Sequence, residues 1–127
     1  MLAVKLGVEI DAIQYLWDTF KDTFDINQQD KDGCTALMLA AQCNKNIQVI
    51  QYLCDTFKDI IKINTQNNDG NTAFMLAVQF NINVEVIQYL FDKFKNIIDI
   101  NIRNNERDTV FMLAAHNTNI RVIKYLY

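Results

Sequence analysis

The chain has 127 residues, of which 50% are hydrophobic and 21% charged, and its formal net charge is −3. These values suit one domain with a buried core and argue against intrinsic disorder. They also lack the clustered lysines and arginines of a nucleic-acid-binding surface, and no apolar run approaches the roughly 18–20 residues of a membrane span. We therefore expect no nucleic acid and no membrane as partners.

The elements expected along the chain come in copies of one unit. Residues 31–64 read KDGCTALMLAAQCNKNIQVIQYLCDTFKDIIKIN, and residues 68–101 read NDGNTAFMLAVQFNINVEVIQYLFDKFKNIIDIN. Three sets of identical residues lie 37 positions apart: Thr35, Thr72 and Thr109; Leu39, Leu76 and Leu113; Asn27, Asn64 and Asn101. A strict period between 20 and 50 residues predicts a solenoid, in which each unit buries its apolar side by stacking on its neighbours.

The predicted helices come in pairs, each a short helix followed by a longer one. In chain order they cover residues 1–6 (the remainder of a helix), 9–23, 36–43, 47–57, 73–80, 84–94, 110–116 and 120 to the end. A start that resembles a short signal peptide is better explained as part of the repeat, since residues 1–17 align with residues 38–54 without a gap.

Local chemistry supports these boundaries. The recurring threonines precede the short helices, and Asn46, Asn83 and Asn119 precede the longer ones, where a side-chain oxygen can cap free backbone amides. Asp-Gly pairs at 32–33 and 69–70 predict tight turns. In the last copy Arg107 stands in the place of glycine. A positive φ there costs about 1–2 kcal/mol for a residue with a side chain, so we expect this hairpin to be the most distorted.

The longer helices carry a wide apolar stripe. Ile50, Leu53, Cys54 and Phe57 stand at i, i+3, i+4 and i+7, and the next copy repeats the pattern. Four further isoleucines after these helices are expected to cover the core: Ile60, Ile61, Ile97 and Ile98. A single helix pair cannot offset its ordering entropy with so few buried side chains, so stacking is obligatory.

The three cysteines, Cys34, Cys43 and Cys54, do not keep register between copies, as a disulfide framework would. We expect reduced thiols in an intracellular, most simply cytoplasmic, protein. Their spacing contains no CxxC pair, so a zinc site is not predicted. His116 is the only histidine and has no partners at catalytic or metal-ligand spacing. We expect no enzyme activity, no metal and no cofactor.

The pattern D-G-x-T-A-L/F-M-L-A, then V-I-Q-Y-L and a loop ending in I-N, resembles the ankyrin repeat over essentially the whole chain. The copies differ from that family in length, 37 residues instead of 33, and in containing no proline. Met38, Met75 and Met112 replace the family's histidine, which we expect to remove its hydrogen bonds. The resemblance implies an all-α, ankyrin-type helical repeat solenoid of about four stacked helix pairs with short hairpin loops. We expect one domain, 1–127, with a partial repeat at 1–30, repeats at 31–67 and 68–104, and a partial repeat at 105–127.

The resemblance also implies a non-catalytic module that binds a protein partner, because that family usually grips partners with the hairpin tips and the exposed side of the short helices. The residues at these places vary between copies, as a binding surface can without disturbing the stack, although surface drift would give the same variation. They are Lys31, Cys34, Asn68, Asn71, Asn105 and Asp108 on the tips, and Gln42, Gln79 and His116 on the helices.

The alternative is a structural spacer, or a self-associating segment of a longer array. Apolar residues at both ends look uncovered: Leu2, Leu6, Ile10, Val110, Ile123 and Leu126. Terminal repeats normally need a polar outer side. We therefore keep end-to-end self-association, or a fragment of a longer array, as an open alternative.

Overall fold

The computed structural model describes residues 15, 18–19, 25–43, 47–80, 83–116 and 124. The predicted helix at 1–6 lies outside these residues. Those at 9–23 and from 120 onward are described only at four positions, each of which is helical. The capping asparagines Asn46 and Asn119 also lie outside the described part.

The described part of the chain contains five helices with defined bounds, and no strand occurs in it. They are α3 (Ala36–Cys43), α4 (Ile47–Phe57), α5 (Ala73–Phe80), α6 (Val84–Phe94) and α7 (Val110–His116). Every one of these bounds agrees with the sequence prediction, which confirms the all-α class.

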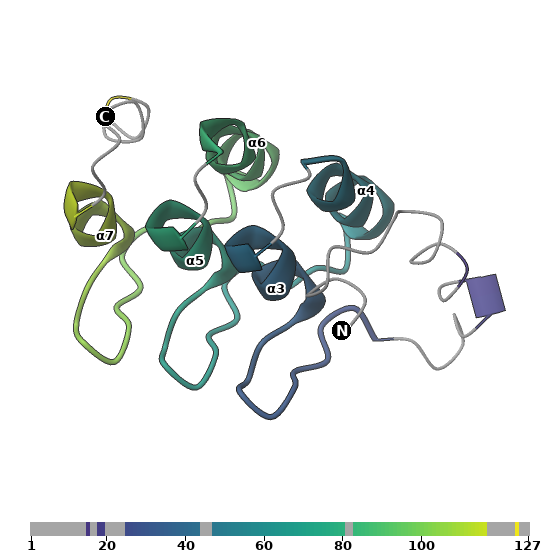
Figure 1. Ribbon diagram of the computed structural model, residues 1–127, viewed down its shortest axis with the longest axis horizontal. Helices are drawn as coiled ribbons and strands as arrows, with labels where there is room; N and C mark the ends of the chain where they lie inside the picture. The colour runs from purple at the N-terminus through teal and green to yellow at the C-terminus, as the bar shows by residue number, and fades with distance from the viewer. Residues whose placement is uncertain are drawn as a thin grey trace.

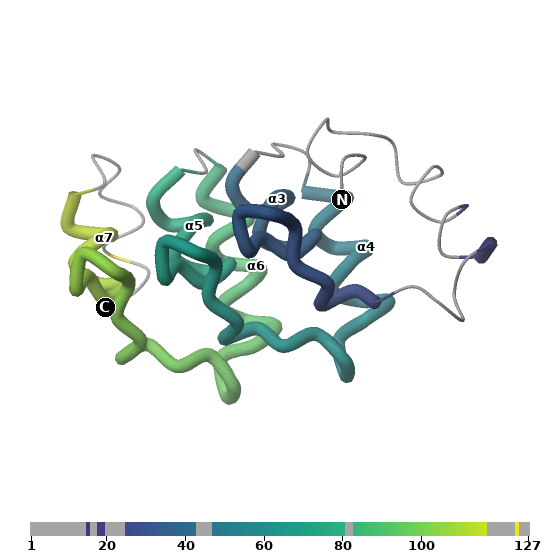
Figure 2. The backbone as a smooth tube through the Cα atoms, turned by 90° about the horizontal axis from the view of Figure 1, so that it is seen from below, coloured from purple at the N-terminus to yellow at the C-terminus, as the bar shows by residue number. Residues whose placement is uncertain are grey.

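The helices form two rows (Figure 1). The short helices α3, α5 and α7 lie side by side in one row, and the longer helices α4 and α6 form a second row, above the first in this view. Three loops extend from the first row, away from the second (Figure 1), and Figure 2 shows them one after another along the long axis of the molecule. We call them the first, second and third hairpins, residues 28–34, 65–71 and 102–108.

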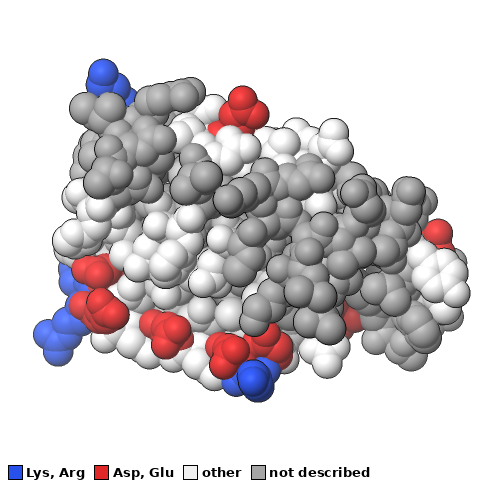
Figure 3. All heavy atoms as spheres, in the orientation of Figure 1, with Lys and Arg blue, Asp and Glu red and all other residues white. Residues whose placement is uncertain are grey.

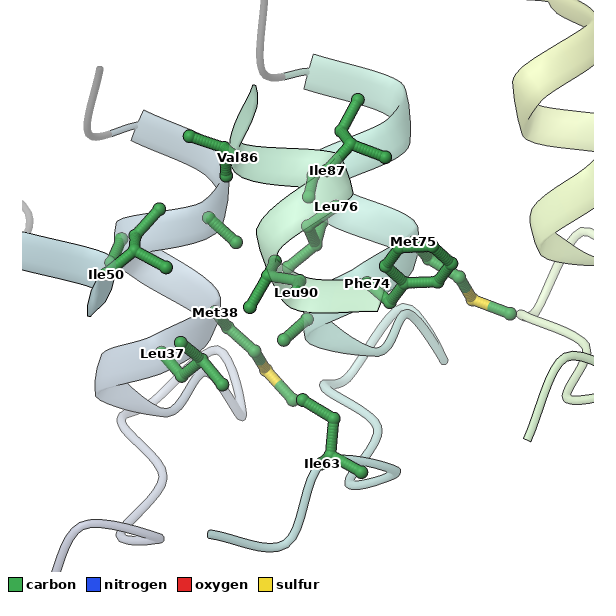
Figure 4. Close-up of a cluster of buried hydrophobic side chains, with 14 of the residues drawn as sticks. Leu37, Met38, Ile50, Ile63, Phe74, Met75, Leu76, Val86, Ile87 and Leu90 are labelled. Carbon is green, nitrogen blue, oxygen red and sulfur yellow. The ribbon is translucent and has the colours of Figure 1, made fainter. Parts of the chain in front are cut away.

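The core lies between the two rows. The predicted stripe of α4 is buried, with Ile50, Leu53 and Cys54 at 0% exposure and Phe57 at 1%. One alanine in each first-row helix allows these helices to pack closely, and each of the three is fully buried: Ala40, Ala77 and Ala114. Figure 4 shows that side chains from both rows and from the loops meet here, as where Met38 of α3 points toward Ile63. Each fully buried aliphatic side chain contributes about 1.5–3 kcal/mol.

The four isoleucines after the longer helices divide into two kinds. Ile61 and Ile98 are partly buried and pack against the core, as predicted. Ile60 and Ile97 are 55% and 57% exposed, so the expectation that all four cover the core is wrong for these two. The reason is local: consecutive residues of the tight turn that follows each helix direct their side chains to opposite sides. The amides of Ile60 and Ile61 both donate to the carbonyl of Phe57.

The predicted helix caps are present wherever the structure describes them. The Oγ1 atoms of Thr35, Thr72 and Thr109 accept from the amides three residues ahead at 3.3, 3.2 and 3.5 Å. Asn83 caps α6 by accepting from the amide of Glu85 at 3.0 Å.

One methionine that replaces the family's histidine still accepts a hydrogen bond. The amide of Thr35 donates to the sulfur of Met38 at 3.4 Å, while the amide of Met38 donates back to Thr35 Oγ1. The expected loss of hydrogen bonding is therefore wrong at Met38. Thr35 and Met38 form a reciprocal pair of the kind that a capping box makes with Glu or Gln.

Each hairpin is held by an Asp or Asn at its base. In the second hairpin, Asn67 Oδ1 accepts from the amides of Asp69 and Asn71 at 3.0 and 2.9 Å. Asp30 and Asn104 make the same pair of bonds in the first and third hairpins. These bonds satisfy backbone donors that no helix or strand would satisfy, so the loops keep one shape.

Asparagine side chains join each hairpin to the one before it. Asn68 Nδ2 donates to the carbonyl of Lys31 at 3.0 Å, and Asn105 Nδ2 donates to that of Asn68 at 2.8 Å. The backbone follows the same path, because the Asn68 amide donates to the Asp32 carbonyl and the Asn105 amide to the Asp69 carbonyl, both at 3.0 Å.

The recurring asparagines Asn27 and Asn64 form a second set of bonds between repeats. Asn27 donates to the carbonyl of Ile60 and accepts from the amide of Lys62, at 2.7 and 2.9 Å. Asn64 repeats this with Ile97 and Asp99, both at 2.9 Å. These recurring asparagines therefore bond the backbone of the following repeat.

Glycine in the first two hairpins serves two purposes. Gly33 and Gly70 have φ of 79° and 81°, and a Cβ on Gly70 would lie 2.7 Å from the backbone nitrogen of Asn105. Arg107 takes the same conformation with φ of 69°, and its amide bonds to the Asn104 carbonyl as in the other hairpins. The expected distortion of the third hairpin is therefore wrong, since Arg107 accepts the strained φ and the turn keeps its shape.

We predict opposite effects for substitutions at these equivalent positions. Gly70→Ala combines an unfavourable φ with a clash against the third hairpin, and it should lower the free energy of unfolding by about 2–4 kcal/mol. Arg107→Gly relieves strain and should raise it by about 0.5–1 kcal/mol after the entropy cost of glycine. Urea unfolding followed by circular dichroism measures both. Arg107→Ala is the control and should change little, and a Gly70→Ala effect as small as the control's would contradict the close approach.

A second prediction separates the asparagines that bridge repeats from one that does not. Asn64→Asp keeps the acceptor but turns a carboxylate toward the Ile97 carbonyl, so it should cost about 1 kcal/mol. The same change at Asn101, whose side chain bonds no residue in the described ranges, should cost less than about 0.5 kcal/mol. Thermal and urea unfolding of the two variants at one pH compares them directly. Equal losses would show that the bridge contributes nothing.

Candidate functional site

A groove with a volume of about 460 Å³ runs across three repeats between the hairpins and the short helices. Its lining comes from all three hairpins and from α3, α5 and α7: Asp32, Cys34, Leu39, Gln42, Asn67, Asp69, Asn71, Leu76, Gln79, Phe80, Asn104, Asn105, Glu106, Asp108 and Leu113. The groove follows directly from the fold, because the stacked hairpins project from one row of helices and form a continuous wall.

The two sides of the groove differ in character. The hairpin side is polar, with carboxylates and amides. The helical side presents Gln79 and Phe80 at the end of α5, both exposed, with Phe80 at 49%. Buried leucines lie between the two sides of the groove, one from each repeat: Leu39, Leu76 and Leu113. A ligand in this groove would therefore meet charge and hydrogen-bonding groups on one side and an aromatic ring on the other.

Most of the residues predicted to bind a partner line this groove. Those that do are Cys34, Gln42, Asn71, Gln79, Asn105 and Asp108. Lys31, Asn68 and His116 are exposed but do not line it. Six of the nine predicted residues thus line the groove, and the other three stand beside it.

Two of the predicted tip residues are not on exposed tips. Cys34 and Asn71 are only 6% and 8% exposed. The reason is that both receive a side chain from the next hairpin: Asn67 Nδ2 donates to Cys34 Sγ at 3.7 Å, and Asn104 Nδ2 donates to Asn71 Oδ1 at 3.0 Å. They form part of the inner wall.

Asn71 brings a spare donor to that wall. Asn104 Oδ1 accepts from two backbone amides, and Asn104 Nδ2 donates to Asn71 Oδ1. The Nδ2 group of Asn71 is therefore the part of its side-chain amide that is not used in this bond. Within the ranges that the structure describes, this Nδ2 donates to no acceptor, although the residue is more than nine-tenths buried. A buried donor without a partner is costly, and a carbonyl oxygen of a bound ligand could satisfy it.

A row of carboxylates along the groove was not predicted as a site. Asp32, Asp69 and Glu106 stand 37 residues apart, one per hairpin, and all three are exposed. Their 37-residue period is present in the sequence, but an Asp-Gly pair is also a usual turn signal, and the turn alone explains two of the three residues. In Figure 3 acidic side chains gather along the lower edge of the molecule, where Figure 1 places the hairpins.

The electrostatic character of the groove is uniformly negative. Asp108 adds a fourth carboxylate, and none of the described residues that line the groove is a lysine, arginine or histidine. The side chains of Asp32, Asp69 and Glu106 make no hydrogen bond or ion pair with another described residue. Charges of one sign in a concave surface attract ligands of the other sign and raise their rate of association.

Chemical groups for catalysis are not gathered in the described part of the chain. It contains no cluster of three or more His, Cys, Asp or Glu side chains that could hold a metal ion. Both described thiols, Cys34 and Cys54, are free and buried. Burial is the main cause that raises the pKa of each thiol above its ordinary value, to about 12 for Cys54. A protonated thiol is a poor nucleophile.

A charged cluster lies outside the groove, on the second row. Asp55 of α4 accepts from the hydroxyl of Tyr89 of α6 at 2.7 Å and pairs with Lys93 of α6. The hydrogen bond with Lys93, then that with Tyr89, lowers the pKa of Asp55, while burial and the nearby carboxylate raise the pKa of Tyr89. The cluster joins two neighbouring long helices and has no connection to the groove lining.

Comparison with known families identifies one match. A family model described as ankyrin repeats (3 copies) matches residues 1–104 and 55–127, which together span the chain. No curated protein matches the chain. None of the helices in the described ranges is both long and apolar enough to cross a membrane.

We predict that the two described thiols resist modification in the folded protein. In a Cys43→Ser background, a disulfide reagent such as DTNB at pH 8 should label Cys34 and Cys54 slowly, because both are buried and their raised pKa leaves little thiolate. Urea should restore rapid labelling of both, which serves as the control. Rapid labelling of the native protein would contradict the buried placement of at least one of them.

Proposed function

Because this chain belongs to the ankyrin-repeat family, we propose that it is a non-catalytic module that binds a protein partner through the groove and the hairpins beside it. Ankyrin repeats are generally protein–protein interaction modules. The groove and the residues that line it are the reason for choosing this surface as the one that binds the partner.

The single observation that carries the proposal is that the groove continues over three repeats. The hairpins that form its wall are held by bonds within the chain and need no ligand for their shape. The bonds that stack the hairpins use backbone groups and the asparagines at their bases. Gln42 and Gln79 take no part in that stacking. A rigid surface of this kind is preformed, so little ordering entropy is lost when a partner binds.

The same site supports a role without catalysis or cofactor. Four carboxylates line the groove, but the lining holds neither a histidine nor an activated thiol to act with them. The proposed setting is intracellular, most simply the cytoplasm. Unpaired Cys34 and Cys54 support it, since reduced thiols are typical of compartments where glutathione and thioredoxin act.

The rival proposal, a spacer or a self-associating segment, is less well supported. Head-to-tail stacking would place a new hairpin on the third one as the third lies on the second. Gly70 allows that approach, because a Cβ there would lie 2.7 Å from Asn105 N, whereas Arg107 carries a Cβ in the equivalent place. Self-association through this edge of the hairpins would need a different geometry.

Site-specific photocrosslinking tests the proposed face. A photoreactive amino acid at Gln79, in the groove, should give a protein adduct in an extract of the source cells. The same amino acid at Thr56, exposed on the second row, should not. Adducts from Thr56 alone would place the partner on the other face and reject the proposal.

A groove variant adds a quantitative control. Phe80→Ala, with the photoreactive residue kept at Gln79, should reduce the adduct severalfold, because it removes the largest exposed apolar side chain of the groove. Circular dichroism should show unchanged helicity, since Phe80 is half exposed and contributes little to the core.

A further inference from the structure

The side chains of Asp32, Asp69 and Glu106 make no bond that holds the fold together, although the carbonyls of Asp32 and Asp69 accept bonds from the next hairpin. Their side chains are exposed and bond no other residue in the described part of the chain, in contrast to the neighbouring Asp30, Asn67 and Asn104, whose side chains hold the hairpins. The row is therefore available to a ligand, and we ask what kind of ligand it fits.

All three hairpins carry a carboxylate at this position, although only the first two have the Asp-Gly pair that is usual in turns. Aspartate before glycine, as at positions 32 and 69, is a usual turn pair, and the turn alone would explain both. The third hairpin has Glu106 before Arg107, and glutamate has no particular preference for turns. What the three positions share is an unpaired carboxylate on the side of the hairpins that faces the groove.

The spacing of the row selects the form of the ligand. Helices that pack side by side have axes about 8–10 Å apart, so equivalent residues of successive repeats recur at about that interval. A polyproline II segment makes one turn in three residues and rises about 9 Å per turn. A β-strand presents same-side residues about 7 Å apart. An extended segment with a repeat of three residues therefore matches the carboxylates better than a strand.

Two further features of the groove suit such a segment. The buried Nδ2 of Asn71 lacks an acceptor, and the backbone carbonyls of a polyproline II segment are free of internal hydrogen bonds. Phe80 lies on the opposite side, where its ring could receive the aliphatic stem or the guanidinium of an arginine.

We propose that the groove binds an extended segment of the partner protein, of polyproline II type, with a lysine or arginine at every third residue facing Asp32, Asp69 and Glu106. The inference rests on the proposed function, because it specifies the partner of the same groove. A shared metal ion is not an alternative, since carboxylates about a repeat apart cannot contact one ion at the 2.3–2.6 Å of calcium ligands.

The test uses synthetic peptides and the full chain. The probe is a fluorescein-labelled peptide in which one arginine alternates with two prolines over nine residues. Its control has the same composition with the three arginines adjacent, and a second control has glutamate in place of arginine. Fluorescence anisotropy should rank the spaced arginine peptide first, the adjacent one several-fold weaker, and the glutamate peptide without binding. Affinity for the probe should fall as salt is raised.

Matched protein variants assign the binding to the row. The triple variant D32N, D69N, E106Q should weaken the probe roughly ten-fold, because each exposed ion pair contributes up to about five-fold in affinity. The control triple variant D18N, D59N, E85Q loses the same charge at exposed positions outside the groove lining, and it should bind the probe as the unaltered chain does. Both should keep the helical content, since all six side chains are exposed.

The outcomes separate the two proposals. Equal binding of the spaced and adjacent peptides, or equal losses in the two triple variants, would overturn the basic, three-residue-repeat ligand. If the photoreactive residue at Gln79 still gave its adduct in that case, the groove would remain the proposed protein-binding site with a ligand of other chemistry. Spacing preference together with loss in the groove variant alone supports the inference.

Discussion

The structure depends on hydrogen bonds that run from one repeat to the next. Loops as long as these hairpins contain many backbone groups that no helix satisfies, and each unpaired group is costly. Asparagines at three places in the repeat meet this need by bonding backbone in their own loop or in a neighbouring one. The hydrophobic core alone would hold the helix rows together, but it would leave the hairpins without a fixed shape. A groove with one hairpin wall exists only because these bonds are made.

The same dependence explains why residues differ between repeats. Asp30 keeps the acceptor that its own loop needs, but its carboxylate has no amide group to donate. Asn67 and Asn104 keep the donor, because each reaches back to its predecessor. Arg107 keeps the positive φ that glycine has in the other two hairpins. Differences between repeats at these positions thus correspond to differences in the bonds that each hairpin makes.

Much of the fold could be predicted, because the signals for it are local and repeated. A period of 37 residues, a threonine before each short helix and an apolar stripe gave the bounds of all five described helices. What could not be predicted depends on contacts across repeats. The burial of Cys34 follows from Asn67, 33 residues away, and the exposure of Ile60 follows from the turn after Phe57. For the groove, the sequence indicated six of the lining residues, and its 37-residue period also contains the row of carboxylates. The exposure of Phe80 depends on how the helices pack and could not be predicted.

Stacking accounts for the residues at most hairpin positions, and this gives the exceptions their meaning. The asparagines and the two glycines have a reason in the contact with a neighbouring hairpin. Asp32, Asp69 and Glu106 have none: their side chains bond no described residue, and turn chemistry does not cover Glu106. Exposed like charges in a row repel one another and bring no stability to the folded chain. A feature repeated three times, slightly unfavourable for folding and directed into a groove, is most simply explained by what the groove binds.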